Sequence, residues 1–257
     1  MKYDKSQLFS TNIESEIIDV AVGDAMVAVL TQGANEQQQM RSYISLFSTV
    51  GEQTGQQIDF GARQVTDFGF YGENDMFWAL TLDTSGVLPI SIISTYKSDG
   101  SMTSNIQETT QIVESVYLTD TAIFTSGTKF LTSYSYFGER QAEDSIHGWE
   151  EAAAWLTPQT CSLAYVPRTE ESDIDVSRVY SSDLSYSQIR LPAQVFSVAV
   201  TDQKLYAFAP EKIYSYFIDG TPDKTTDLSY TLTAVKQVSN TQAVLWSASG
   251  SYIMDLT

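Results

Sequence analysis

The chain of 257 residues is poor in the residues on which many catalytic and metal sites depend. It has one cysteine, Cys161, and one histidine, His147. A single cysteine cannot form an intramolecular disulfide, and one cysteine with one histidine cannot supply the four ligands of a structural zinc site. Nucleophilic catalysis by Cys161 would need a neighbouring base, and no motif places His147 beside it. We therefore expect no zinc site, and we expect Cys161 to be a buried strand residue.

Positive charge is also scarce. There are 14 lysines and arginines against 32 aspartates and glutamates, which gives a net charge of −18 at pH 7. The basic residues are scattered singly, so the field of the molecule repels phosphate backbones and anionic lipid surfaces. The sequence therefore predicts no nucleic-acid partner and no membrane contact by this domain itself.

Long apolar runs are absent as well. The longest candidate, Ile17 to Leu30, is interrupted by Asp19 and Asp24, whereas a membrane-spanning helix needs about 20 apolar residues. The first residues, Met1 to Ser6, contain no apolar signal core. We expect a cytoplasmic location if the chain is full length. A trimmed ectodomain, with a membrane anchor before it in the longer protein, would instead be extracellular or lie at the cell envelope.

What the chain does contain favours β-structure. Hydrophobic residues make up 42% of it, and 15 tyrosines and 12 phenylalanines are present. Aromatic side chains pack well on pleated strands. Charged residues are only 18%, so the polar surface is built largely from uncharged side chains. This composition predicts a folded, β-rich protein.

An internal repeat is the most informative pattern. Six segments share a short β-run, a tight polar turn and a second apolar strand; they are Asp19–Leu30, Asp67–Leu80, Ser115–Phe124, Ala153–Val166, Ser197–Phe208 and Val235–Trp246. Equivalent positions recur at spacings of 38 to 48 residues, the length of a four-stranded propeller blade. A third strand follows each unit, and two of these end in Asp-Gly, at Asp99 and Asp219. That dipeptide is typical of two-residue hairpin turns.

The repeat predicts an all-β fold: a single six-bladed β-propeller domain of four-stranded antiparallel blades over residues 1–257. The predicted blades are about 14–60, 61–108, 109–149, 150–191, 192–230, and 231–257 completed by 1–13. The last unit ends after its third strand, Tyr252–Leu256, so Gln7–Ile13 would supply the fourth strand and close the ring. Seven blades or a β-sandwich are the alternatives. Residues 149–156 are rich in helix formers, which leaves helix and strand both open there.

With the strands placed, Glu211–Gly220 resembles the third strand and turn of quinoprotein-like and WD-repeat-like blades. The chain also resembles uncharacterised propeller domains of Gram-positive gut bacteria, which usually follow an N-terminal membrane anchor. This resemblance implies an envelope-facing domain. The chain departs from the WD-repeat signature, from the tryptophan docking motifs of quinone-cofactor enzymes and from the repeated boxes of sialidases. These departures argue against each of those functions, and we expect no cofactor.

Five residues form the candidate binding surface. Asp24, Asp120 and Asp202 follow equivalent inner strands, so a propeller would place them on one face as an acidic rim around the channel mouth. Their turn positions explain them equally well, because aspartate caps turns. His147 and Trp149 lie in an irregular stretch and form either a contact surface or a packed corner.

No residue is assigned a catalytic, cofactor-binding or metal-ligating role. Glu170–Asp175 is the densest carboxylate cluster, but it lacks the glycine-centred turn of a calcium loop, so we interpret it as a solvated loop.

We predict a non-enzymatic binding or interaction propeller at the bacterial envelope, with an unidentified protein or carbohydrate as partner. Recognition would fall to the channel mouth and to three loops, Gln32–Arg41, Ser98–Thr110 and Gly138–Trp149. One alternative is a carbohydrate-active hydrolase that uses channel-mouth carboxylates. The other is a structural module of a larger envelope assembly, with a flat apolar patch instead of a pocket.

Overall fold

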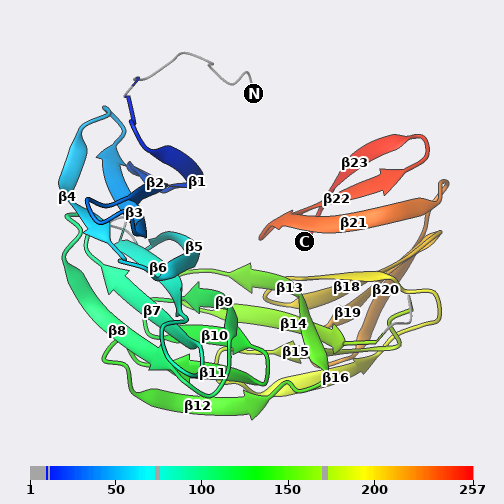
Figure 1. The fold of residues 1–257 in the computed structure, drawn as a ribbon. Coiled ribbons are helices and arrows are strands. Elements are labelled where there is room, and N and C mark those ends of the chain that lie inside the picture. The colour runs from blue at the N-terminus through cyan, green and yellow to red at the C-terminus, as the bar shows by residue number, and fades with distance from the viewer. Residues whose placement is uncertain (1–9, 11, 73–75, 170–172, 257) are drawn as a thin grey trace. The chain divides into compact units, whose positions relative to one another are not determined.

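The computed structural model of the chain describes residues 10, 12–72, 76–169 and 173–256. Within them, the regular structure consists of 23 strands in six antiparallel sheets (Figure 1), which confirms the all-β prediction. Residues 149–156 form strand β13 (Trp149–Leu156), so the helical alternative is wrong. Pairing with a neighbouring strand has overridden the helix propensity of its alanines and glutamates. The described residues include no helix long and apolar enough to span a membrane.

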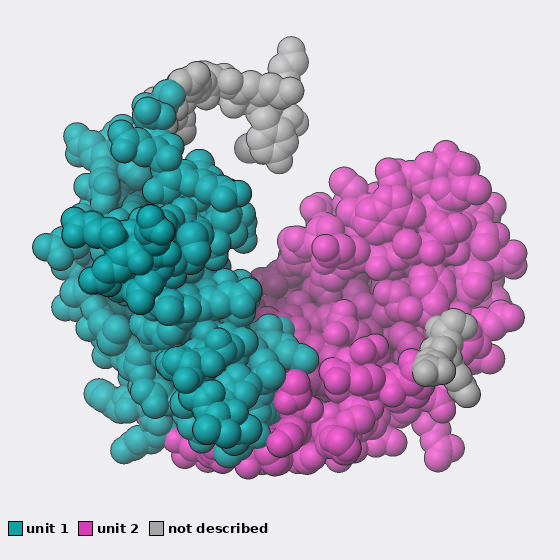
Figure 2. Space-filling view, in the orientation of Figure 1, with its two compact units in different colours: residues 1–116, 136–139 teal, residues 117–135, 140–257 magenta. Residues whose placement is uncertain are grey.

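The chain divides into two compact units, residues 1–116 with 136–139 and residues 117–135 with 140–257 (Figure 2). The first unit contains two four-stranded sheets in which each strand pairs with the next in the chain. Their strands are β1 (Glu16–Val22), β2 (Met26–Ala34), β3 (Met40–Ser48), β4 (Gln53–Asp59), β5 (Gln64–Tyr71), β6 (Met76–Asp83), β7 (Ile90–Tyr96) and β8 (Met102–Glu108).

The described part of the second unit holds three four-stranded sheets and one of three strands, again paired in chain order, with β9 beginning in the first unit. The strands are β9 (Val113–Leu118), β10 (Ile123–Gly127), β11 (Phe130–Tyr134), β12 (Arg140–Ser145), β13 (Trp149–Leu156), β14 (Cys161–Pro167), β15 (Val176–Tyr180), β16 (Tyr186–Arg190), β17 (Ser197–Val200), β18 (Lys204–Ala209), β19 (Lys212–Phe217), β20 (Pro222–Asp227), β21 (Leu232–Ser239), β22 (Gln242–Ser247) and β23 (Gly250–Asp255). The predicted closing strand, Gln7–Ile13, falls largely outside the described residues.

Apolar faces of successive sheets stack within each unit. In the first unit, Leu30 and Ile44 of one sheet pack against Phe68 and Phe77 of the next. In the second unit, three such layers join the four sheets in chain order. The inner strands are buried on both faces, as β14 and β18 are, whereas the outer strands β4 and β20 are mostly exposed. Within the units, the first strands of neighbouring sheets lie beside each other for β1 and β5, for β13 and β17, and for β17 and β21.

The hairpins between third and fourth strands differ from the predicted two-residue Asp-Gly turn. In the β7–β8 hairpin, the Gly100 N–H donates to the Lys97 carbonyl and the Lys97 N–H to the Ser101 carbonyl, each at 2.9 Å. The loop therefore has three residues, and only Gly100 has a positive φ, of 82°. The β15–β16 and β19–β20 hairpins repeat this geometry, with Leu184 and Gly220 in the left-handed position.

An aspartate stabilises each of these three turns, and this predicts an acid sensitivity. Asp99 accepts a hydrogen bond from the Ser101 hydroxyl, Asp183 accepts one from the Ser185 hydroxyl, and Asp219 accepts one from the Thr221 N–H. Each bond holds the pKa of its carboxyl below the usual value. A lowered folded-state pKa stabilises the fold above about pH 4, and this contribution is lost as the pH falls through that pKa.

We therefore expect the urea midpoint to fall between about pH 5 and about pH 3, and to fall less steeply in the triple variant Asp99→Asn, Asp183→Asn, Asp219→Asn. Asparagine keeps the oxygen acceptor and removes the titration. Asp67, whose pKa burial raises, opposes this trend in both proteins and cancels in the comparison. Equal pH slopes in the two proteins would show that these turns do not carry the effect.

Candidate functional site

The three aspartates of the predicted acidic rim all lie in turns between the first and second strands of their sheets. Asp24 follows β1, Asp120 follows β9 and Asp202 follows β17, and all three are exposed. Asp24 belongs to the first unit and the other two to the second. Two of the turns are closed by a threonine hydroxyl: Thr119 accepts the N–H of Ala122 at 3.2 Å, and Thr201 accepts that of Lys204 at 3.0 Å.

The predicted aromatic surface at His147 and Trp149 is organised around an arginine. His147 is exposed, whereas Trp149 is half-buried at the start of β13. The Arg178 guanidinium lies 4.2 Å from the centre of the Trp149 ring and 4.7 Å from that of Tyr186. One face of the Trp149 ring is thus covered by Arg178, as expected for a packed corner.

Loss of this sandwich is expected to cost about 1 kcal/mol of stability. We predict that Arg178→Leu lowers the free energy of unfolding by that amount in urea titrations, because both aromatic rings lose their cationic partner. The matched control is Arg168→Leu. Arg168 is 51% exposed and makes a long ion pair of 3.8 Å with Glu150, so its loss should cost less than about 0.5 kcal/mol. Equal effects of the two variants would contradict a stabilising role of the stack.

The three loops predicted to carry recognition are mostly strand. Gln32–Arg41 contains the end of β2 and the start of β3, Ser98–Thr110 contains β8, and Gly138–Trp149 contains β12. The prediction that these segments are loops was wrong at β8 and β12, because these outer strands carry polar side chains on exposed faces, which are hard to distinguish from loops in a sequence.

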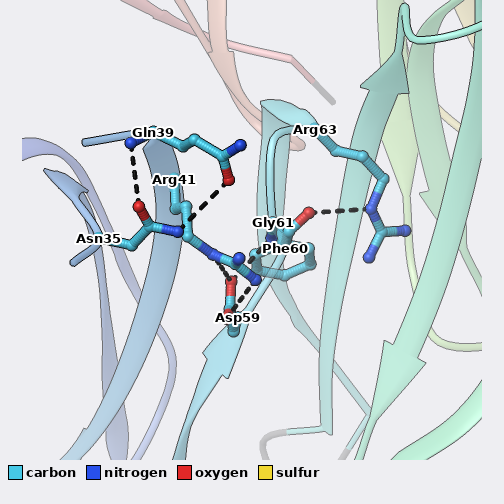
Figure 3. Close-up of polar contacts among 7 residues, drawn as sticks. All are labelled: Asn35, Gln39, Arg41, Asp59, Phe60, Gly61 and Arg63. Carbon is cyan, nitrogen blue, oxygen red and sulfur yellow. Dashed lines mark hydrogen bonds and ion pairs between the residues drawn. The ribbon is translucent and has the colours of Figure 1, made fainter. Parts of the chain in front are cut away.

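In the first of these segments, the side chains of Asn35, Gln39 and Arg41 make hydrogen bonds (Figure 3). Arg41 donates to Asp59 through Nε at 3.1 Å and Nη2 at 2.7 Å, and the Gly61 N–H donates to the same carboxylate at 2.7 Å. Burial alone would raise the pKa of Asp59, but the hydrogen bonds from Arg41 and Gly61 outweigh it and lower that pKa. Asn35 Oδ1 accepts the N–H of Gln39 at 2.9 Å and so closes the β2–β3 turn. These contacts join β3 to the end of β4 and close the β2–β3 turn, so they stabilise the fold of this sheet.

The second unit contains a groove of about 430 Å³ lined by the first strands of three consecutive sheets. β13 contributes Glu151–Ala154, β17 contributes Ser197 and Val198, and β21 with its following turn contributes Val235–Asn240. Each of these strands is the terminal strand of its sheet and pairs only with the second strand of that sheet. One backbone edge of each is therefore left without a ladder partner.

Two carboxamide side chains pair with these edges near the turn end of the groove. Gln237 accepts the Val200 N–H at 3.0 Å and donates to the Val200 carbonyl at 2.9 Å. Asn240 accepts the Leu156 N–H at 3.0 Å and also donates to the Leu156 carbonyl. A carboxamide has the same donor and acceptor as a peptide group, so each of these side chains substitutes for a neighbouring strand at one position.

Among the described residues that line the groove, the titratable side chains are those of Glu151 and Lys236. Glu151 is the one carboxylate among the described lining residues, and it accepts a hydrogen bond from Tyr117. Cys161 is buried, and desolvation raises the pKa of its thiol to about 11, so a thiolate nucleophile is disfavoured.

The predicted carboxylate cluster lies elsewhere in the second unit. Its first three residues, Glu170–Ser172, lie outside the described residues. Asp173 accepts the Gln194 N–H at 3.2 Å. Across the described chain no three His, Cys, Asp or Glu side chains are placed to hold a metal ion.

Gln237 and Asn240 were not among the candidate residues, although the sequence held a signal for one of them. In the alignment of the six repeats, Gln237 is equivalent to small or aromatic residues such as Ala21, Tyr117 and Ala199. A carboxamide at a position where the other repeats have no carboxamide indicates a specific hydrogen-bonding role.

The comparisons with known proteins support the fold. No protein-family model matches the chain, and no curated protein matches it. The β-propeller domain of the trilobed protease from Pyrococcus furiosus, described as having an open velcro topology, is similar at a TM-score of 0.60 and 11% identity over 95% of this chain and 82% of that one. Hsv2p from Kluyveromyces lactis is similar at a TM-score of 0.50 and 8% identity, over 89% and 70% of the two chains. The repeated sheets and these neighbours show a fold of the β-propeller kind.

Proposed function

We propose that the chain is a non-catalytic interaction module that binds a protein partner in the groove of the second unit. The observation that supports this proposal most is that the groove is lined by the first strands of three sheets. The free edges of two of them, β17 and β13, already pair at one residue each with a carboxamide of β21 or of its turn. The groove volume of about 430 Å³ lies within the range of pockets that bind ligands. Backbone edges favour hydrogen-bonded recognition of another chain.

The groove gives less support to the hydrolase alternative. Glycoside hydrolysis uses two carboxyl groups on opposite sides of the scissile bond, and the described lining of the groove offers Glu151 alone. Asp120 and Asp202 of the predicted rim are exposed and are not among the residues that line the groove.

The test compares wild-type protein with a blocked groove. Ala152 is an exposed lining residue at the bulge of β13, so Ala152→Trp fills the groove without entering the core. Thr226→Trp on exposed β20 is the matched control. From a lysate of the source organism, we expect wild type and Thr226→Trp to retain a protein that Ala152→Trp does not. Equal retention by all three, or hydrolysis of a polysaccharide panel by wild type, would refute the proposal.

We further propose that the six sheets are the blades of one ring of the quinoprotein-like or WD-repeat-like type, with residues 1–13 completing the sixth blade. In its support, β23 pairs only with β22 among the described strands, and Ile253 on it is 71% exposed. Deleting residues 1–13 should lower the thermal midpoint, and a synthetic peptide of these residues should restore it. An unchanged midpoint would argue against closure by this segment.

The expected envelope location also remains a proposal. A domain exposed to an oxidising compartment benefits from having no accessible thiol, and Cys161 is 1% exposed. Cell fractionation with protease protection tests this location: digestion of the protein on intact cells supports it, and full protection refutes it.

A further inference from the structure

We infer that the groove recognises an extended peptide segment through its backbone, which pairs with the outward peptide group of Ala154 on β13. This inference rests on the proposed function and names the chemistry of its ligand. Two observations support it. The first is which peptide groups of β13 and β17 point into the groove, and the second is that side-chain carboxamides already bind the adjacent outward peptide groups.

The direction of each peptide group on β17 follows from the turn. The Thr201 N–H donates to the Lys204 carbonyl at 2.8 Å, so this pair forms the first rung of the β17–β18 ladder. In an antiparallel pair, bonded and non-bonded residues alternate. Val200 and Val198, opposite Leu205 and Ala207, therefore direct their N–H and C=O groups away from β18. The bonds from Gln237 to Val200 agree with this alternation.

The same reasoning holds for β13. The Thr157 N–H donates to the Thr160 carbonyl at 2.9 Å and forms the first rung of the β13–β14 ladder. Leu156 and Ala154, opposite Cys161 and Leu163, thus point their peptide groups away from β14. Asn240 binds the group of Leu156. The group of Ala154, two residues further along, faces the groove that Ala154 lines.

The hydrogen bonds that the chain itself makes to these strand edges indicate which kind of ligand the groove would bind. At both strands the outward group nearest the turn is paired with a carboxamide, which is chemically a single peptide unit. The next outward groups, of Ala154 and Val198, line the groove. An extended segment of a partner protein presents peptide groups at the same spacing as the outward peptide groups of a strand edge. The hydroxyl groups of a sugar do not have this spacing.

We assign the pairing to β13 because its edge is longer and more accessible than that of β17. β13 has eight residues against four in β17, and Ala154 is half-buried whereas Val198 is 3% exposed. The side chains of Ala152–Ala154 are small and leave space beside the edge. Val198 lies on another wall of the same groove.

The test uses peptides whose backbone, rather than side chains, is altered. A random 12-residue library displayed on phage is selected on wild-type protein and counter-selected on Ala152→Trp. The strongest peptide is synthesised in three forms: unmodified, and N-methylated at alternate residues in each of the two registers. Because a strand bonds through one edge with every other residue, we expect one methylated register to lose at least about tenfold in affinity and the other to keep it.

A protein variant complements the peptides. Ala154→Pro removes the outward N–H without removing a hydrogen bond of the β13–β14 ladder, at a position where a strand edge tolerates proline, and should weaken the unmodified peptide at least about tenfold; circular dichroism verifies its fold. Equal binding by both methylated registers, or failure to select any peptide, overturns the inference. If the lysate partner is still excluded by Ala152→Trp while both registers bind equally, the groove function stands and backbone recognition fails.

Discussion

Replacing Phe77 by alanine is expected to lower the free energy of unfolding by about 3–5 kcal/mol, the usual cost of removing a buried phenylalanine. Phe77 on β6 is fully buried, and its ring centre lies 6.1 Å from that of Phe68, 5.7 Å from that of Phe70 and 5.9 Å from that of Tyr96. Truncation would leave a cavity between the two sheets of the first unit and remove three aromatic contacts. Urea unfolding monitored by circular dichroism measures the change.

The matched control for this prediction is Phe137→Ala. Phe137 belongs to the same unit but is 93% exposed, so its truncation should change the free energy of unfolding by less than about 1 kcal/mol. A comparable loss in both variants would mean that the layer around Phe77 is not the core of the first unit.

Replacing Gln237 by alanine is expected to cost about 1–3 kcal/mol, because it removes the donor and the acceptor that Val200 uses. Val200 is fully buried, so water reaches its peptide group poorly and cannot fully replace the carboxamide. Urea unfolding again gives the magnitude.

Two further variants test whether the lost stability comes from the hydrogen bonds of the Gln237 carboxamide. Gln237→Glu keeps an oxygen for the Val200 N–H but has no donor for the Val200 carbonyl, so a loss similar to that of alanine is expected. Lys236→Ala, at the exposed neighbouring position, should change stability by less than about 0.5 kcal/mol. An unaltered stability of Gln237→Ala would show that the strand edge needs no partner there.

The inner strands could be predicted from the sequence because their apolar residues face packed layers. Ala199 and Val200, for example, are both fully buried, and such runs stand out between turn residues. The outer strands could not be predicted in this way. Every residue of β20 is exposed, so no apolar period marks it. β8 and β12 were taken for loops because most of their side chains are polar.

The candidate site was harder to predict than the strands. Asp120 and Asp202 were chosen because they follow equivalent inner strands, yet in both turns a threonine hydroxyl makes the closing bonds. Gln237 and Asn240 lie in a recognised repeat, but their role depends on a backbone edge in another sheet. Sequence separations of 37 residues to Val200 and 84 residues to Leu156 cannot be read from local pattern.

Hydrogen exchange of four backbone amides tests the central claim most directly, because it needs no ligand. The account holds that the edges of β13 and β17 are capped at Leu156 and Val200 and open at Ala154 and Val198. It predicts that the capped amides exchange slowly in the free protein, that the open ones exchange faster, and that Gln237→Ala speeds exchange at Val200 more than at Leu156. Slow exchange at Ala154 and Val198, matching that at Leu156 and Val200, would mean that the groove presents no open backbone edge and would contradict the account.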